Sequence, residues 1–152
     1  MILKVEDVMV EDVVTIDANA TVIEAVDLMN QYEIGCLIVT RRGRAVGIVT
    51  ERDLLKRVLA KFKDPKTTKV QEIMSKPLIV GDPSMEVEDA AKLMFMKKIK
   101  KLPIVDQGRL LGLVTLTDLA RFQPQMIRLL KRISNRELPP RRLKKVIDYY
   151  VV

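Results

Sequence analysis

Histidine is absent from this chain of 152 residues, and cysteine occurs once, at Cys36. Without histidine the usual zinc sites of Cys and His ligands cannot be assembled, and Ser-His-Asp and Cys-His mechanisms are excluded. A single cysteine also excludes a disulfide within the chain. Carboxylate or lysine catalysis stays open, but no pair of such residues stands out. We therefore expect a protein that is not an enzyme and that has neither a metal site nor a catalytic cofactor.

Long apolar runs are missing as well. None approaches the roughly 20 residues that a membrane-spanning helix needs, and the start, MILKVEDVMVED, turns acidic too early for a signal peptide. The proportions of hydrophobic and charged residues, 48% and 31%, are those of a globular protein. We expect a soluble, cytoplasmic protein without a membrane partner, folded as one domain or as two small, tightly packed halves.

Positive charge is concentrated at the C-terminal end. Residues 123–152 carry a net charge of +6 out of the total of +7, so residues 1–122 are close to neutral. The basic residues are Arg128, Lys131, Arg132, Arg136, Arg141, Arg142, Lys144 and Lys145, against Glu137 and Asp148. The basic character of the chain therefore belongs to its tail.

Nearly the same seven letters occur twice, as GIVTERD at residues 47–53 and as GLVTLTD at residues 112–118. An offset of 65 residues aligns residues 5–54 with residues 70–119 without a gap, and 16 of these 50 positions are identical. The chain is thus a tandem duplication. About 50 residues make a marginal core, so we expect the two copies to pack sheet to sheet around a pseudo-twofold axis.

Each copy shows the same order of hydrophobic patterns, which predicts an α/β (α+β) fold of two β-α-β-β-α units. The predicted elements are a short strand (residues 13–16 and 78–80), an amphipathic helix (from residues 22 and 87), a hairpin (residues 36–50 and 102–115) and a closing helix (residues 51–60 and 116–122). We expect the first repeat in residues 1–62, the linker and second repeat in residues 63–122, and a basic helical extension in residues 123–152.

The arrangement resembles the tandem CBS domain, named after cystathionine β-synthase. The resemblance covers residues 5 to about 122 and rests on a leading V-x-x-h-M, a helix with Ala and Met four apart, I-x-x-L before the hairpin, and G-h-h-T-x-x-D at its end. Each motif alone is weak, but their shared order at one offset is specific. The resemblance implies a stand-alone, homodimeric energy or metabolite sensor that acts on a separate effector protein. Its ligand would be AMP, ADP, ATP or S-adenosylmethionine, bound in two related clefts.

Carried over by motif position, the resemblance implies that Asp53 and Asp118 accept hydrogen bonds from ribose hydroxyls, and that Thr50 and Thr115 face the ribose or phosphate. The base would lie between the first strands and the segments ahead of the hairpins. These bracketing residues are Val13, Val14, Thr15, Ile34, Gly35, Cys36, Leu78, Ile79, Val80, Ile99, Lys100 and Lys101. The two lysines could also add positive charge for a phosphorylated ligand.

The two copies depart from the family pattern at different positions. The second has the typical Pro103 where the first has Ile38, and the first has the typical Arg52 where the second has Thr117. Both clefts could bind, or one could have decayed. Of the two, the sequence favours Asp53 with Arg52 as the phosphate site.

Several of these residues also have a purely structural interpretation. Thr-x-x-Asp before an apolar helix resembles a capping box, although Asp reaches back less well than Glu, and a threonine can serve both purposes. Gly47 and Gly112 are interpreted as strand residues that another backbone approaches closely. Cys36 is interpreted as a small buried apolar residue.

The tail is predicted to form two amphipathic helices. The first begins near Pro124, and Pro139 and Pro140 separate it from a second that begins near Arg141. The apolar stripe of the first helix consists of Met126, Ile127, Leu130 and Ile133. Packing on the module or across a dimer is the default interpretation. A nucleic-acid contact and a partner protein are the alternatives, and no known nucleic-acid-binding motif accompanies the basic residues.

Overall fold

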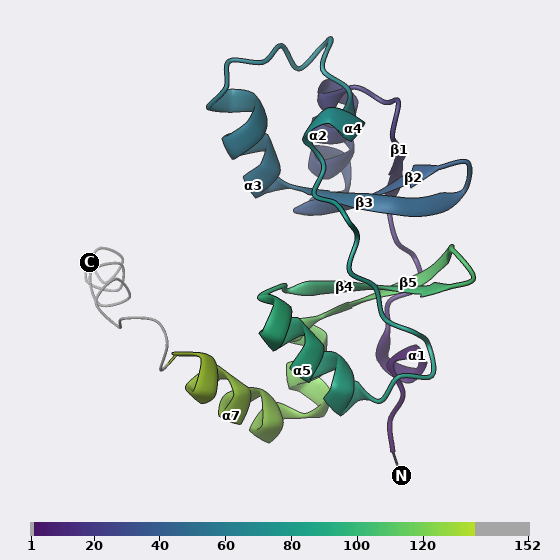
Figure 1. Ribbon diagram of the computed structural model, residues 1–152, viewed down its shortest axis with the longest axis vertical. Coiled ribbons are helices and arrows are strands. Elements are labelled where there is room, and N and C mark those ends of the chain that lie inside the picture. Colours follow the sequence, from purple (N-terminus) through teal and green to yellow (C-terminus); the bar gives the residue numbers. More distant parts are fainter. Residues whose placement is uncertain (1, 136–152) are drawn as a thin grey trace.

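The computed structural model describes residues 2–135, and they form two stacked halves (Figure 1). The sheet of the first half has the order β1-β2-β3, with β1 parallel to β2 and β2 antiparallel to β3, while β4 and β5 pair as an antiparallel hairpin in the second half. The strands are β1 (Thr15–Asp17), β2 (Cys36–Arg41), β3 (Arg44–Thr50), β4 (Lys101–Asp106) and β5 (Arg109–Thr115). The sheets face each other with the helices outside, which confirms the predicted α/β fold of two repeats.

Equivalent helices occur in the two halves, and the N-terminal boundary of the first long helix follows from local chemistry. The N–H of Thr21 donates to Glu24 Oε2 at 2.7 Å and the N–H of Glu24 donates to Thr21 Oγ1 at 3.3 Å, which is a capping box. The helices are α1 (Val5–Val8), α2 (Val22–Tyr32), α3 (Glu51–Leu54), the π-helical turn η1 (Leu55–Leu59), α4 (Val70–Ile73), α5 (Val87–Lys97), α6 (Leu116–Phe122) and α7 (Pro124–Asn135). The predicted closing helix of the first repeat is thus α3 continued by η1.

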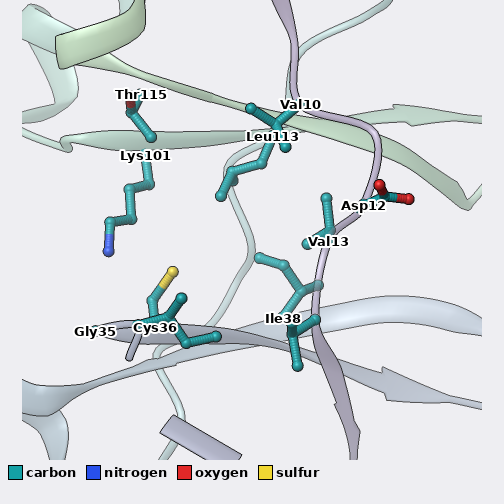
Figure 2. Close-up of a pocket in the computed structure, with 11 residues that line it drawn as sticks. Val10, Asp12, Val13, Gly35, Cys36, Ile38, Lys101, Leu113 and Thr115 are labelled. Atoms are coloured by element: carbon teal, nitrogen blue, oxygen red, sulfur yellow. The ribbon is translucent and has the colours of Figure 1, made fainter. Parts of the chain in front are cut away.

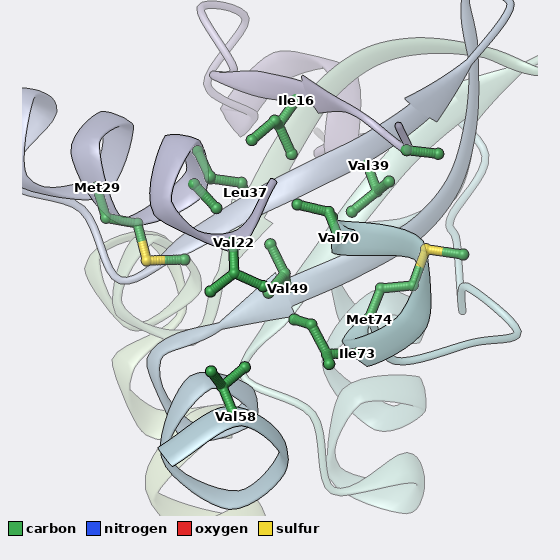
Figure 3. Packing of buried hydrophobic residues seen from close by; sticks show 12 residues of the cluster. Ile16, Val22, Met29, Leu37, Val39, Val49, Val58, Val70, Ile73 and Met74 are labelled. Atoms are coloured by element: carbon green, nitrogen blue, oxygen red, sulfur yellow. The ribbon is translucent and has the colours of Figure 1, made fainter. Parts of the chain in front are cut away.

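The short leading helix of each repeat packs on the other repeat. Val5 and Val8 of α1 are buried in the second core, and the N–H of Val5 donates to Met85 O at 2.8 Å. Conversely, Val70 and Ile73 of α4 lie in the first core, where Figure 3 shows them packed beside residues of α2 and β3. Each core therefore contains side chains from both halves, so each half depends on the other to cover its apolar surface.

Two glycines sit where these crossing segments meet the hairpins. The backbones of Ile48 and Ser75 exchange hydrogen bonds at 3.2 and 2.8 Å beside Gly47. A Cβ at Gly47 would lie 2.6 Å from Met74 Sδ, and a Cβ at Gly112 would lie 2.8 Å from the carbonyl oxygen of Val10. The interpretation of both glycines as points of close backbone approach is confirmed.

The first strand of the second repeat is missing, contrary to the prediction for residues 78–80. In the first repeat the N–H of Ile38 donates to Val14 O at 3.4 Å, which ties β2 to the segment that leads into β1. Pro103 stands at the position equivalent to Ile38 and has no N–H to donate. The segment pairs only at Gly81, whose N–H donates to Pro103 O at 2.8 Å. In the first repeat the strand comprises Thr15–Asp17 rather than residues 13–16.

Helix α7 packs against α5 and α6. Ile127 is 2% exposed in the second core, and Met126 and Leu130 are partly buried beside it, whereas Ile133 is 56% exposed. This arrangement agrees with the default interpretation of the first tail helix, except that Ile133 lies outside the buried stripe. The predicted second tail helix and the basic residues from Arg136 onward lie outside the described residues. Within residues 2–135, no helix combines the length and hydropathy that crossing a membrane requires.

Candidate functional site

A cavity of about 360 Å³ lies between the two sheets and draws its walls from both repeats (Figure 2). The first repeat contributes Val13, Val14, Ile34, Gly35, Cys36 and Ile38; the second contributes Lys101, Leu113 and Thr115; Val10 and Asp12 come from the segment before β1. Most of these side chains are apolar. The exceptions with charge or a hydroxyl are Asp12, Lys101 and Thr115, so the cavity combines apolar walls with a few polar groups, as ligand sites commonly do.

The polar end of the cavity is built by the junction of β5 and α6. The N–H of Asp118 donates to Thr115 Oγ1 at 3.1 Å, and the N–H of Thr115 donates to Asp118 Oδ2 at 3.4 Å. Asp118 does not line the cavity, but this capping box holds it beside Thr115, which does. Within the described part of the chain the half-buried Asp118 carboxylate has no other hydrogen-bond or ion-pair partner. Most of its acceptor capacity is therefore unused.

The equivalent carboxylate in the first repeat is fully engaged. Asp53 is 8% exposed, and its Oδ2 accepts hydrogen bonds from the N–H of Thr50 at 2.9 Å and from Thr50 Oγ1 at 3.1 Å. Its Oδ1 accepts a hydrogen bond from Ser75 Oγ at 3.1 Å and lies 3.9 Å from Arg57 Nη1. Both capping boxes foreseen as the structural interpretation of Thr-x-x-Asp are thus present, but only that of Asp53 is reinforced by other side chains.

The difference between the two carboxylates follows from residues at equivalent positions. Ser75 corresponds to Val10 and Arg57 corresponds to Phe122 under the offset of 65. Neither Val10 nor Phe122 has a side-chain donor, so neither can hydrogen-bond to Asp118. Arg57 is itself held in place, since its Nη1 donates to the carbonyl oxygens of Ile73 and Met74 at 3.0 and 2.9 Å.

The structure brings together seven of the predicted site residues around one cavity: Val13, Val14, Ile34, Gly35, Cys36, Lys101 and Thr115. The other predicted residues lie elsewhere. Thr15, Arg52, Val80 and Lys100 are exposed, Leu78 is half-buried, and Ile79 and Ile99 pack against the second core. Pro103 is buried in β4, and Thr50, Asp53 and Asp118 take part in the capping boxes just described.

Four cavity residues were not predicted: Val10, Asp12, Ile38 and Leu113. A signal existed for Ile38, because its equivalent Pro103 was among the predicted residues. Val10 and Leu113 meet through a pair of backbone hydrogen bonds, each 2.9 Å long, between segments more than 100 residues apart in sequence. Only the packing of the leading segment onto the other repeat reveals that contact.

Cys36 agrees with its structural interpretation, since it is 7% exposed, although its side chain also contributes to the cavity wall. Across residues 2–135, no cluster of three or more His, Cys, Asp or Glu side chains could hold a metal ion.

Comparison with known proteins is consistent with this geometry. The family model described as "CBS domain" matches residues 5–60 and 70–124. The CBS domain-containing protein YhcV of Bacillus subtilis is 43% identical over 116 residues, which is 76% of this chain and 82% of YhcV. The fold is a tandem α/β repeat module, and the chain belongs to the CBS domain family.

Solved structures of related proteins show the same fold. The CBS domain protein TA0289 of Thermoplasma acidophilum superimposes with a TM-score of 0.78 at 31% identity, over 90% of this chain and 78% of TA0289. The CBS domain pair of protein MJ0100 superimposes with a TM-score of 0.73 at 28% identity, over 82% of this chain and 98% of that one. The MJ0100 structure is a complex with 5′-methylthioadenosine and S-adenosyl-L-methionine.

Proposed function

We propose that this chain is a regulatory module that binds an adenine nucleotide, or a related adenosine compound, in the cavity between its repeats. The observation that carries the proposal is a cavity between the repeats in which mostly apolar side chains of the first repeat face Lys101 and Thr115 of the second. Its volume of about 360 Å³ falls within the usual range of ligand pockets, about 300–1,000 Å³. The candidate ligands are AMP, ADP, ATP and S-adenosylmethionine.

The chemistry of an adenosine compound matches the two ends of the cavity. Val14 and Ile34 offer apolar surface on which a base can pack, and Thr115 with the neighbouring Asp118 offers acceptors for ribose hydroxyls. A hydrogen bond from a neutral hydroxyl to a carboxylate contributes about 1.5–3 kcal/mol. The adenosyl ligands of the related MJ0100 pair support this choice.

The proposal places the ligand beside Asp118 rather than beside Asp53, whereas the sequence favoured Asp53 with Arg52. Asp53 already accepts three hydrogen bonds from Thr50 and Ser75. A ligand that binds there must first replace these protein contacts, whereas a ligand at Asp118 meets an acceptor that the protein has left unused.

Regulation follows from the shared walls of the cavity. A ligand that contacts both repeats stabilises the relative arrangement of the repeats that it binds most tightly. It increases the fraction of molecules in that arrangement only as far as its affinity for that arrangement exceeds its affinity for the others. We propose that the module works as a homodimer and that a separate effector protein reads this change, without a catalytic step in this chain.

Isothermal titration calorimetry of the wild-type protein with AMP, ADP, ATP and S-adenosylmethionine tests the proposal. We expect saturable binding of at least one ligand with one site per chain. Alkylation of the single Cys36 provides a local readout, because a bound ligand should slow its reaction with a small thiol reagent. The absence of binding by all four ligands to a folded protein, checked by circular dichroism, would contradict the proposal.

The alternative function, nucleic-acid binding through the basic tail, stays a prediction because most of the residues that suggest it lie outside residues 2–135. Truncation after Asn135 tests it without disturbing Ile127 in the second core. Loss of salt-sensitive RNA or DNA binding on truncation would favour the alternative, and unchanged binding would exclude the removed segment as its cause.

A further inference from the structure

Lys101 supplies a positive charge to the cavity. It begins β4, where it is paired in register with Thr115 of β5, so its side chain arises at the polar end of the site. In Figure 2 the Lys101 side chain extends from β4 into the space between the sheets, and the Cys36 side chain points toward it from the opposite wall. Lys101 is half-buried as a residue, and none of the residues that the structure describes forms an ion pair or hydrogen bond with its ammonium group.

The position of this charge differs between the repeats. Lys101 is equivalent to the uncharged Cys36, and Arg52 is equivalent to the uncharged Thr117. Each repeat therefore has one cationic residue at these two positions, but Arg52 is exposed on α3 whereas Lys101 lines the cavity. Lys101 therefore brings a positive charge into the cavity, whereas the first repeat has its charge outside it, at Arg52.

Three carboxylates lie near the cavity, and none of them forms an ion pair with Lys101. Glu51 is beside the cavity residue Gly35, where a Cβ would lie 3.3 Å from its Oε1. Asp12 lines the cavity from the segment before β1, but its carboxylate points away from the lysine in Figure 2. Asp118 is held beside Thr115 by its capping box. An ammonium in a partly desolvated cavity attracts an anion and repels a cation more strongly than it would in bulk water.

We infer that Lys101 selects the charge of the ligand, so that the cavity prefers an adenosine compound with phosphate groups to one that is neutral or cationic. This inference rests on the proposed function, because it presumes that adenosine compounds bind here. AMP and ATP are the anionic probes, 5′-methylthioadenosine is the neutral probe, and S-adenosylmethionine carries the positive sulfonium.

The test compares the four probes by titration calorimetry on the wild type and on Lys101→Met, which keeps a long flexible side chain but removes its charge. We expect the wild type to bind AMP at least about tenfold more tightly than 5′-methylthioadenosine. Lys101→Met should weaken AMP binding about tenfold and leave 5′-methylthioadenosine within about twofold. Rising ionic strength should weaken AMP binding to the wild type more than to the variant.

Lys100→Met is the matched control, since Lys100 precedes Lys101 but is exposed and does not line the cavity. It should leave the preference for AMP unchanged. If 5′-methylthioadenosine or S-adenosylmethionine binds as tightly as AMP, or if the preference survives in Lys101→Met, the inference is wrong while the proposed function stands. If none of the four probes binds the folded wild type, both are wrong.

Discussion

Asp53 and Asp118 occupy equivalent positions in the two repeats, at the third residue of a closing helix, and each takes part in a capping box with the threonine before it. Asp53 also accepts a hydrogen bond from Ser75, forms an ion pair with Arg57, and is 8% exposed. Asp118 has Val10 and Phe122 at the corresponding places and keeps a largely unused carboxylate. Duplication has thus preserved the motif at both places, while substitutions elsewhere have left only one carboxylate available.

The largest expected effect is on ligand affinity. Replacing Asp118 with Asn should weaken nucleotide binding about 100-fold, because the charge that strengthens two hydrogen bonds to the ribose is lost. Asp53→Asn should change the affinity by less than about threefold. Titration calorimetry on both variants measures the two affinities. Equal losses of affinity in Asp118→Asn and Asp53→Asn would show that both carboxylates contribute equally to nucleotide binding.

Stability should show the opposite order. Asp53→Ala leaves the Ser75 hydroxyl and the Thr50 N–H without their acceptor and removes the ion pair with Arg57, and we expect the free energy of unfolding to fall by about 2 kcal/mol. Asp118→Ala removes only a long capping hydrogen bond of 3.4 Å and should cost less than about 1 kcal/mol. Urea denaturation without ligand tests both values. A larger loss of stability for Asp118→Ala would contradict the proposal that Asp53 serves mainly the fold and Asp118 mainly the ligand.

The glycines offer a matched pair at the crossing segments. A Cβ at Gly112 would lie 2.6 Å from Met9 Sδ and 2.8 Å from Val10 O, and at Gly47 it would lie 2.6 Å from Met74 Sδ and 3.0 Å from Ser75 O. The methionine can move, but the carbonyl belongs to a hydrogen-bonded backbone. We expect Gly112→Ala to lower the free energy of unfolding by about 1.5 kcal/mol and Gly47→Ala by less. Chemical denaturation that ranks Gly47→Ala as the worse variant would overturn this order.

The smallest expected effect comes from transferring one partner of Asp53 to Asp118. Val10 is equivalent to Ser75 and is 49% exposed, so Val10→Ser should be tolerated in the fold. Its hydroxyl can donate to Asp118 and compete with the ribose, which should weaken nucleotide binding about threefold. Val10→Ala is the control without a donor, and an equal loss in both variants would attribute the effect to lost packing.

The outline of the fold could be predicted from the sequence because the same hydrophobic patterns and motifs occur in both copies. The offset of 65 residues and the recurring hydrophobic patterns predict two α/β units with a hairpin in each, and the structure has both. The missing strand at residues 78–80 was not foreseen, because its apolar letters resemble those at residues 13–16. Its absence depends on two missing N–H groups, that of Pro103, which neighbours this segment in space and not in sequence, and that of Pro83, which stands where Ala18 donates to Thr40 O in the first repeat.

The candidate site was predicted less completely. The segments Val13–Val14 and Ile34–Cys36 were found because they recur at fixed places in the motif, and they line the cavity. Nothing in the repeated letters shows which wall of one repeat faces which residue of the other. Val10 and Leu113 meet only after the leading segment has crossed to the second repeat, so no local pattern predicts their contact.

By itself the sequence determined the duplication, the order of the elements, the position of the Thr-x-x-Asp motifs and the exclusion of histidine chemistry, since these depend on residue identity and spacing. The tertiary structure alone decided that Thr115 faces the walls of the first repeat, that Lys101 enters the cavity, and that Asp53 is engaged by Ser75 and Arg57. The physical reason is that a carboxylate can bind a ligand only with the acceptor sites that the protein has left free. Packing between segments distant in sequence decides how many of those sites are already used.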